Sequence, residues 1–158
     1  MTYADISAVL NLTKEVKTGM HNDEAYDALQ AKAIDYADKK INNKLKKNSV
    51  QIPTTTEIED LKSKLTSEDE SIKKEAEKDP LTSIFEAGNL YAAAFIFTTY
   101  YSSSDTISPT SKSYQTDADE FVDGYIDEYL QNNQESHAGI QIGIFTINCH
   151  TGEDDELD

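Results

Sequence analysis

The pattern of apolar and polar positions predicts a mainly helical protein with one apolar helix at its centre. Residues 81–101 repeat apolar side chains at helical spacing, and the preceding Asp79 and Pro80 form a typical cap and first turn. The charge-free run 87–104 just reaches the roughly 18 residues needed to cross a membrane, but four of its residues are serine or asparagine. We therefore expect a buried core helix. Its expected core positions are Phe85, Tyr91, Ala92 and Phe95.

Amphipathic helices on either side of this segment are expected to pack against it. The stronger pattern covers residues 23–45, which begin at Asp23 and end in a lysine-rich turn. Its apolar positions are Tyr26, Leu29, Ala33, Ala37, Ile41 and Leu45. The second covers residues 117–133, with Phe121, Val122, Tyr125, Ile126 and Tyr129 expected in the core. A short N-terminal element adds an apolar face of Tyr3, Ile6, Val9 and Leu10.

Two intervening segments are polar. Residues 57–78 consist mostly of charged residues and serine, and a capping box formed by Ser67 and Glu70 divides them into two short helices. We expect this charged helical insertion to be a solvated face. Residues 102–116 have the composition of a loop.

The apolar period changes from helical to alternating near the C-terminus. After Gly139 the apolar positions are Ile140, Ile142, Ile144, Phe145 and Ile147, with a shift of phase that a bulge near Gly143 would explain. This alternation predicts a β-strand over residues 140–149, which must pair with another strand. The only weak candidate within the chain is 49–52, so the expected partner is another chain.

These elements predict an all-α fold with a C-terminal addition. We expect a small helical bundle of four to five helices around the central apolar helix, with a C-terminal β-strand arm. The helical domain covers residues 1–133, including the charged insertion 57–78. Residues 134–158 form the predicted strand and an acidic tail.

Charge is high and unevenly distributed. The chain of 158 residues has a net charge of −16, and all 14 of its basic residues are lysine. Because arginine supplies the bidentate contacts that read guanine, its absence argues against specific DNA reading. Residues 117–158 contain twelve acids and no lysine, whereas the end of the 23–45 helix is basic. The molecule is therefore electrically two-ended.

Candidate chemistry is scarce. A partial calcium loop begins at Asp119, but Phe121 and Leu130 stand where the loop requires oxygen ligands. The three histidines lie far apart, Cys149 has no base at a recognisable spacing, and no glycine-rich phosphate loop is present. We therefore predict no catalytic residues, no metal, no cofactor and no enzymatic activity.

Five features follow one another over roughly residues 1–133, namely "TYADISAVLNL", "DEAYDALQAKAIDYADKKINNKL", Pro53, "PLTSIFEAGNLYAAAFIFTTYY" and "DADEFVDGYIDEYLQNN". This order of elements resembles that of the head–tail connector (adaptor) proteins of tailed bacterial and archaeal viruses. The charged insertion is longer than such proteins usually need, and the C-terminal segment lies outside the shared core.

The resemblance implies a structural virion protein that is made in the host cytoplasm and placed in the virion neck. Such a protein forms a homo-oligomeric ring beneath the portal, through which DNA passes. Its implied partners are further copies of the chain, the portal protein and tail or stopper proteins. DNA is only a non-specific cargo, and no membrane is involved.

A ring subunit needs complementary surfaces on its two sides. One expected interface comprises the basic end and the C-terminal segment, namely Lys39, Lys40, Lys44, Lys46, Lys47, Ile140, Ile142, Ile144, Phe145 and Ile147. The expected acidic channel or partner face comprises Asp119, Glu120, Asp123, Asp127 and Glu128.

The alternative hypothesis is an acidic DNA mimic or protein-interaction module. In such a protein an acidic helix replaces the row of phosphates and blocks a DNA-binding partner. Behaviour in solution separates the two hypotheses. A connector forms rings or binds a portal, whereas a mimic is a monomer or dimer that competes with DNA in a salt-dependent way.

Overall fold

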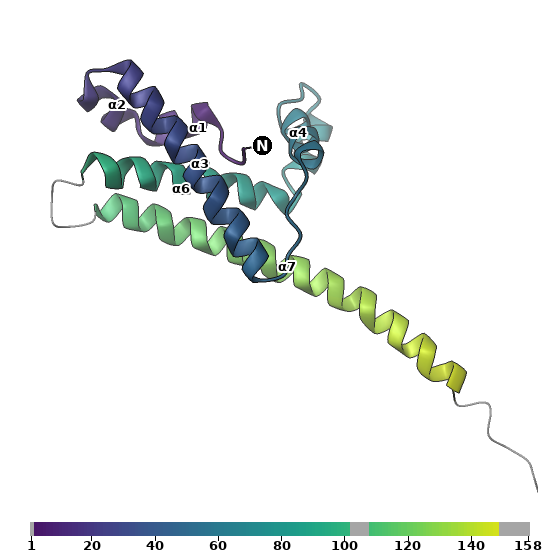
Figure 1. Cartoon of the computed structure of the whole chain (residues 1–158). Helices are drawn as coiled ribbons and strands as arrows, with labels where there is room; N and C mark the ends of the chain where they lie inside the picture. Colours follow the sequence, from purple (N-terminus) through teal and green to yellow (C-terminus); the bar gives the residue numbers. More distant parts are fainter. Residues whose placement is uncertain (1, 102–107, 149–158) are drawn as a thin grey trace, which may run out of the picture.

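A computed structural model of the protein describes residues 2–101 and 108–148, with side chains through residue 133. Within these residues the chain is all-helical, which confirms the predicted class (Figure 1). The helices are α1 (Ile6–Leu12), α2 (Lys14–Met20), α3 (Asp23–Lys47), α4 (Thr55–Leu65), α5 (Glu70–Ala76), α6 (Leu81–Tyr100) and α7 (Pro109–Asn148). The number exceeds the expected four to five because the N-terminal segment and the charged insertion each form two helices.

Helix α6 forms the centre of the core. Its sides pack against α3, α7 and α1, and its buried residues extend around most of the helix. Ile84, Tyr91, Ala92 and Ile96 have no exposed surface. Phe95, expected in the core, is only partly buried and its ring lies 4.9 Å from that of Tyr36. Small residues in α6 allow its neighbours to approach closely.

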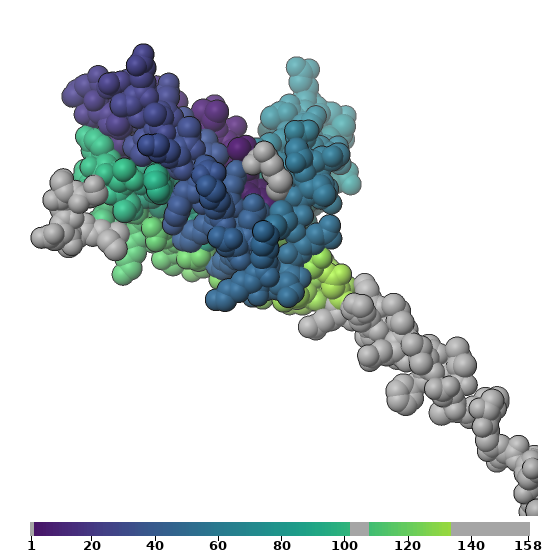
Figure 2. Space-filling model, viewed as in Figure 1, coloured from purple at the N-terminus to yellow at the C-terminus, as the bar shows by residue number. Residues whose placement is uncertain are grey.

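Helix α3 lies across the face of α6 and α7 (Figure 2). The helix begins one residue earlier than predicted, because the Asn22 side chain caps it by accepting a hydrogen bond from the Ala25 backbone at 3.0 Å. Its buried face carries the predicted Tyr26, Ala33, Ala37, Ile41 and Leu45. Lysines in its last turn lie where the helix dipole favours positive charge.

The charged insertion forms two short helices, as predicted, but with different caps. The capping box lies at the start of α4, where Glu57 donates its backbone N–H to Thr54 Oγ1 at 3.3 Å and its carboxylate accepts from the Thr54 backbone at 2.6 Å. Asp69, rather than Ser67, caps α5. The inward side chains are Ile58, Leu61 and Ala76.

Helix α7 begins at Pro109, inside the segment predicted to be a loop. Ser111 explains this early start, since its buried hydroxyl donates to the Ala94 carbonyl of α6 at 2.9 Å. The buried residues that follow include Ala118, Val122 and Ile126. Phe121 was predicted to be in the core, but it is 41% exposed. It lies about 100° around the helix from Val122, which takes the inward position instead.

The predicted β-strand near the C-terminus is not found. Residues 140–148 are the last part of α7, and 49–52, the proposed partner within the chain, form a turn and irregular backbone. The sequence permits both structures, because Ile140, Ile144 and Ile147 also stand at helical spacing. Extending an existing helix needs no new nucleus, whereas a strand needs a partner. The acidic tail, 149–158, lies outside the described residues.

The N-terminal segment packs closely against α6 at Gly88. Tyr3 is buried there and donates its hydroxyl to Asn42 Oδ1 of α3 at 2.7 Å. A Cβ atom at Gly88 would stand 3.0 Å from both the Ala4 backbone nitrogen and Tyr3 Cβ. The absence of a side chain at this position therefore allows the N-terminal segment to reach the core.

Gly88→Val is expected to destabilise the fold by about 1–3 kcal/mol, because a branched side chain must displace the N-terminal segment. Gly124→Val is the matched control, since a Cβ at Gly124 meets nothing within 4 Å. It is expected to change stability by less than about 0.5 kcal/mol. Urea unfolding measures both variants, and an equal effect at the two glycines would contradict the close packing at Gly88.

Candidate functional site

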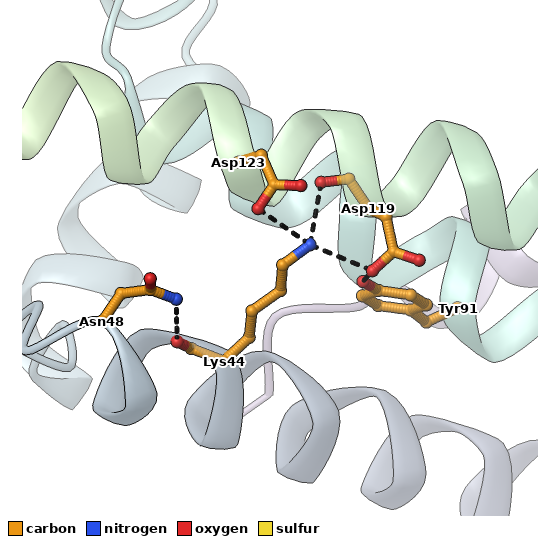
Figure 3. Close-up of polar contacts among 5 residues, drawn as sticks. All are labelled: Lys44, Asn48, Tyr91, Asp119 and Asp123. Atoms are coloured by element: carbon orange, nitrogen blue, oxygen red, sulfur yellow. Dashed lines mark hydrogen bonds and ion pairs between the residues drawn. The ribbon is translucent and has the colours of Figure 1, made fainter.

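A polar cluster joins α3, α6 and α7 where the three helices meet (Figure 3). The Lys44 ammonium of α3 lies 3.0 Å from Asp119 Oδ1 and 3.0 Å from Asp123 Oδ1, both on α7. It also donates to the Asp119 backbone carbonyl at 3.1 Å. The Tyr91 hydroxyl of α6 donates to the same carboxylate oxygen at 2.5 Å. One lysine and one tyrosine therefore anchor α7 to both of its neighbours.

The electrostatics of this cluster favour its charged forms. Burial raises the pKa of Asp119, but hydrogen bonds from Tyr91 and Lys44 and the charges of Lys40 and Lys44 outweigh it, so the pKa lies below its usual value. Burial lowers the pKa of Lys44, and its bonds to Asp123 and Asp119 more than compensate. Lys40 lies 4.0 Å above the Tyr91 ring, a cation–π contact.

The structure brings together residues that sequence analysis assigned to two separate surfaces. Lys44 was expected on a basic interface, and Asp119 and Asp123 on an acidic face, yet the three residues pair within one chain. Lys39 forms an ion pair with Asp35 one turn away. Exposed residues of the two predicted surfaces remain at Lys46, Lys47, Glu120, Asp127 and Glu128. These five are available to a partner.

The partial calcium motif is part of continuous helix. Residues 119–130 lie within α7, and Asp119 and Asp123 bind Lys44 instead of forming a loop around an ion. Among the described side chains, no group of three or more histidine, cysteine, aspartate or glutamate residues could hold a metal ion. The arrangement of the cluster is that of a structural clamp between helices.

The predicted apolar interface residues lie in a projecting part of α7. Figure 1 shows α7 running beside α6 and then continuing past the other helices. We call residues 134–148 the arm. The arm contains Ile140, Ile142, Ile144, Phe145 and Ile147. At 1.5 Å per residue its 15 residues add about 22 Å to the helix.

A cleft of about 330 Å³ lies between α4, the start of α6 and α7. Its wall contains the rings of Tyr125 and Tyr129, and its acids include Glu57, Asp79 and Glu128. Burial raises the pKa of Tyr125, and the charges of these acids raise it further. Sequence analysis missed the cleft because its residues come from segments far apart in the chain, with no shared motif.

Acidification is expected to weaken the clamp. Because the pKa of Asp119 is depressed in the folded protein, its contribution to stability is present above the unfolded pKa of about 3.9 and is lost as pH falls through the folded value. The carboxylate is 45% exposed, so solvent screening limits this contribution to about 1 kcal/mol. Asp119→Asn should remove that part of the pH dependence.

Urea unfolding between about pH 5 and pH 3 measures the difference, because this window includes the ordinary carboxyl pKa. The wild-type protein should lose more stability over that interval than Asp119→Asn. Asp127→Asn is the control, since the Asp127 side chain is exposed and is not in an ion pair among the described residues. Identical profiles for wild type and Asp119→Asn would show that the clamp contributes nothing to folding.

Within residues 2–101 and 108–148, no helix has the length and apolar content required to cross a membrane. The chain matches no protein-family model, and comparisons with curated proteins and with solved structures gave no match.

Proposed function

We propose that the protein is a head–tail connector (adaptor) subunit of a tailed virus. It is a structural virion protein that forms a homo-oligomeric ring beneath the portal, and DNA passes through this ring. Its neighbours are the portal protein and a tail or stopper protein. The protein acts in the virion neck and has no enzymatic role.

The observation that supports this proposal best is the arm. Helix α7 continues for 15 residues beyond Asn133, and the arm is rich in isoleucine. The last α7 residue that is buried among the described side chains is Ile126. A long apolar helix costs free energy in water unless another surface covers it. An assembly subunit needs an element of this kind, whereas a monomeric protein does not.

The exposed charges suit the same role. Glu120, Asp127 and Glu128 lie on the exposed surface of α7, where they are free of the Lys44 clamp. Acids that face a channel repel the phosphate backbone, so DNA can pass without being held. Lys46 and Lys47 at the end of α3 are exposed and provide the opposite charge for a neighbouring surface.

Negative-stain electron microscopy tests the proposal most directly. The purified chain, alone and mixed with a portal protein from a tailed virus of the same host, should give ring-shaped particles with a central opening, and the rings should attach to portal particles. Particles without an opening and without portal binding would overturn the connector function.

The second candidate function is DNA mimicry, and the exposed acids of α7 favour it. Asp117, Glu120 and Asp127 lie outward on one continuous helix, as a mimic of a phosphate row requires. A mimic would displace DNA from a DNA-binding protein, and the displacement would weaken as salt rises. Ring formation should behave in the opposite way, because salt screens repulsion between copies that each carry a net charge of −16.

A further inference from the structure

The arm continues the apolar pattern that α7 uses inside the fold. Val122, Ile126 and Tyr129 lie on the side of α7 that contacts the core. The residues 18 positions further along the chain are Ile140, Ile144 and Ile147, in the same order. Eighteen residues equal five helical turns, so these three residues occupy the same angular positions around α7 as the core residues. We call them the first stripe.

A second set of apolar residues falls on the other side of the arm. Ala138, Ile142 and Phe145 stand at helical spacing with one another. At 100° per residue their mean position is roughly 160° from the first stripe. We call them the second stripe. Polar residues and glycines separate the two stripes around the helix. His137 and Gln141 lie in one gap between the stripes, and Gly139 and Thr146 lie in the other.

Two opposed stripes predict two neighbours for each arm. A helix that pairs with one partner needs a single apolar seam. A helix in a closed ring of parallel helices needs one seam for the preceding copy and a different one for the next copy. Such contacts join unlike surfaces, which is the heterologous type of interface that generates rings.

Charge identifies the partner as another copy of this chain. Copies with a net charge of −16 repel one another over most of their surface. From Ser136 to Thr151 the sequence contains no acid and no lysine. The arm is therefore the part of the chain where two copies meet with the least repulsion. A basic partner would instead bind the acidic part of α7.

We infer that the arms of neighbouring copies pack side by side as a ring of parallel helices, in which the first stripe of one copy contacts the second stripe of the next. This inference rests on the proposed ring and specifies the contact that holds it together. It also explains why α7 is much longer than the α6 helix against which it packs.

Disulfide cross-linking of full-length protein tests the inference. Cys149→Ser removes the only cysteine. In that background, Ile144→Cys marks the first stripe, Phe145→Cys marks the second, and Thr146→Cys is the matched control between the stripes. After mild oxidation, each single variant should remain uncross-linked. A mixture of Ile144→Cys with a size-tagged Phe145→Cys should give cross-linked dimers that contain one chain of each kind.

A chain with both Ile144→Cys and Phe145→Cys should give a ladder of cross-linked species. Cross-linking of Ile144→Cys with itself would overturn the inference, because it would mean that like stripes meet in a two-fold pair. Equal cross-linking through Thr146→Cys, or none in any mixture, would also overturn it. Rings in the microscope without cross-links would leave the connector function standing, whereas a ladder without portal binding would contradict only the connector function.

Discussion

Ile96→Ala is expected to lower the free energy of unfolding by about 2–5 kcal/mol. Ile96 lies in the C-terminal half of α6 and has no exposed surface, so truncation removes buried methyl groups and leaves a cavity. The surrounding core cannot close fully around that cavity, because α3 and α7 hold α6 on two sides. Urea unfolding followed by circular dichroism measures the loss.

Ile72→Ala makes the same chemical change on the surface. Ile72 lies on α5 and is 42% exposed, so this variant should lose less than about 1 kcal/mol. The ratio of the two losses therefore reports the position of the core, independently of the chemistry of the substitution. Similar losses at Ile96 and Ile72 would show that α6 is not the centre of the fold.

Deleting residues 134–158 is expected to leave a folded body and to abolish assembly. The Lys44 clamp and the core contacts of α7 involve residues up to Tyr129, all before the deletion. The body should therefore keep its cooperative unfolding transition, and only the helical signal of the arm should disappear. Without the arm, the truncated chain should sediment as a monomer.

Two results with the truncated chain would contradict this expectation. Unfolding of the truncated chain would mean that the C-terminal residues complete the core of their own copy. Normal assembly would mean that the arm is dispensable, which contradicts the main support for the proposed function. Ile144→Asp in the full chain is a milder companion variant, since one charge within the first stripe should also prevent assembly without shortening the protein.

The sequence predicted the helices well where the apolar pattern was long. The bounds of α3 and α6 agree with the pattern to within one or two residues, because many core positions contribute to each. Caps were less predictable. Asn22 and Asp69 act as caps where Asp23 and Ser67 were expected, since several neighbouring residues had suitable side chains. The Thr54 cap of α4 was not predicted.

The C-terminal segment shows a limit of pattern reading. Isoleucines at positions 140, 142 and 144 alternate as in a strand, but 140, 144 and 147 also follow a helical period. The choice depends on what lies before the segment and on whether a strand partner exists. The five-turn repeat from Val122 to Ile140 was readable from the sequence, and it becomes informative once α7 is seen to continue.

The polar clamp was beyond sequence analysis for a different reason. Lys44 and Asp119 are separated by 75 positions, and each looked like part of a charged surface. Only the crossing of α3 and α7 brings them together, and Tyr91 supplies the buried hydroxyl that completes the site. The charge pattern of the sequence therefore overestimated the charge that is available to partners, because Lys44 and Asp119 neutralise one another within the chain.

The mass of the species that the full chain forms in solution tests the central claim, assembly through the arm, most directly. Sedimentation over a range of concentrations and salt should give one closed species, whose mass is a fixed multiple of 17.6 kDa. That species should become more stable as salt rises, because screening reduces repulsion between acidic copies. A monomer of 17.6 kDa at every concentration and salt would contradict assembly through the arm, and with it the proposed ring.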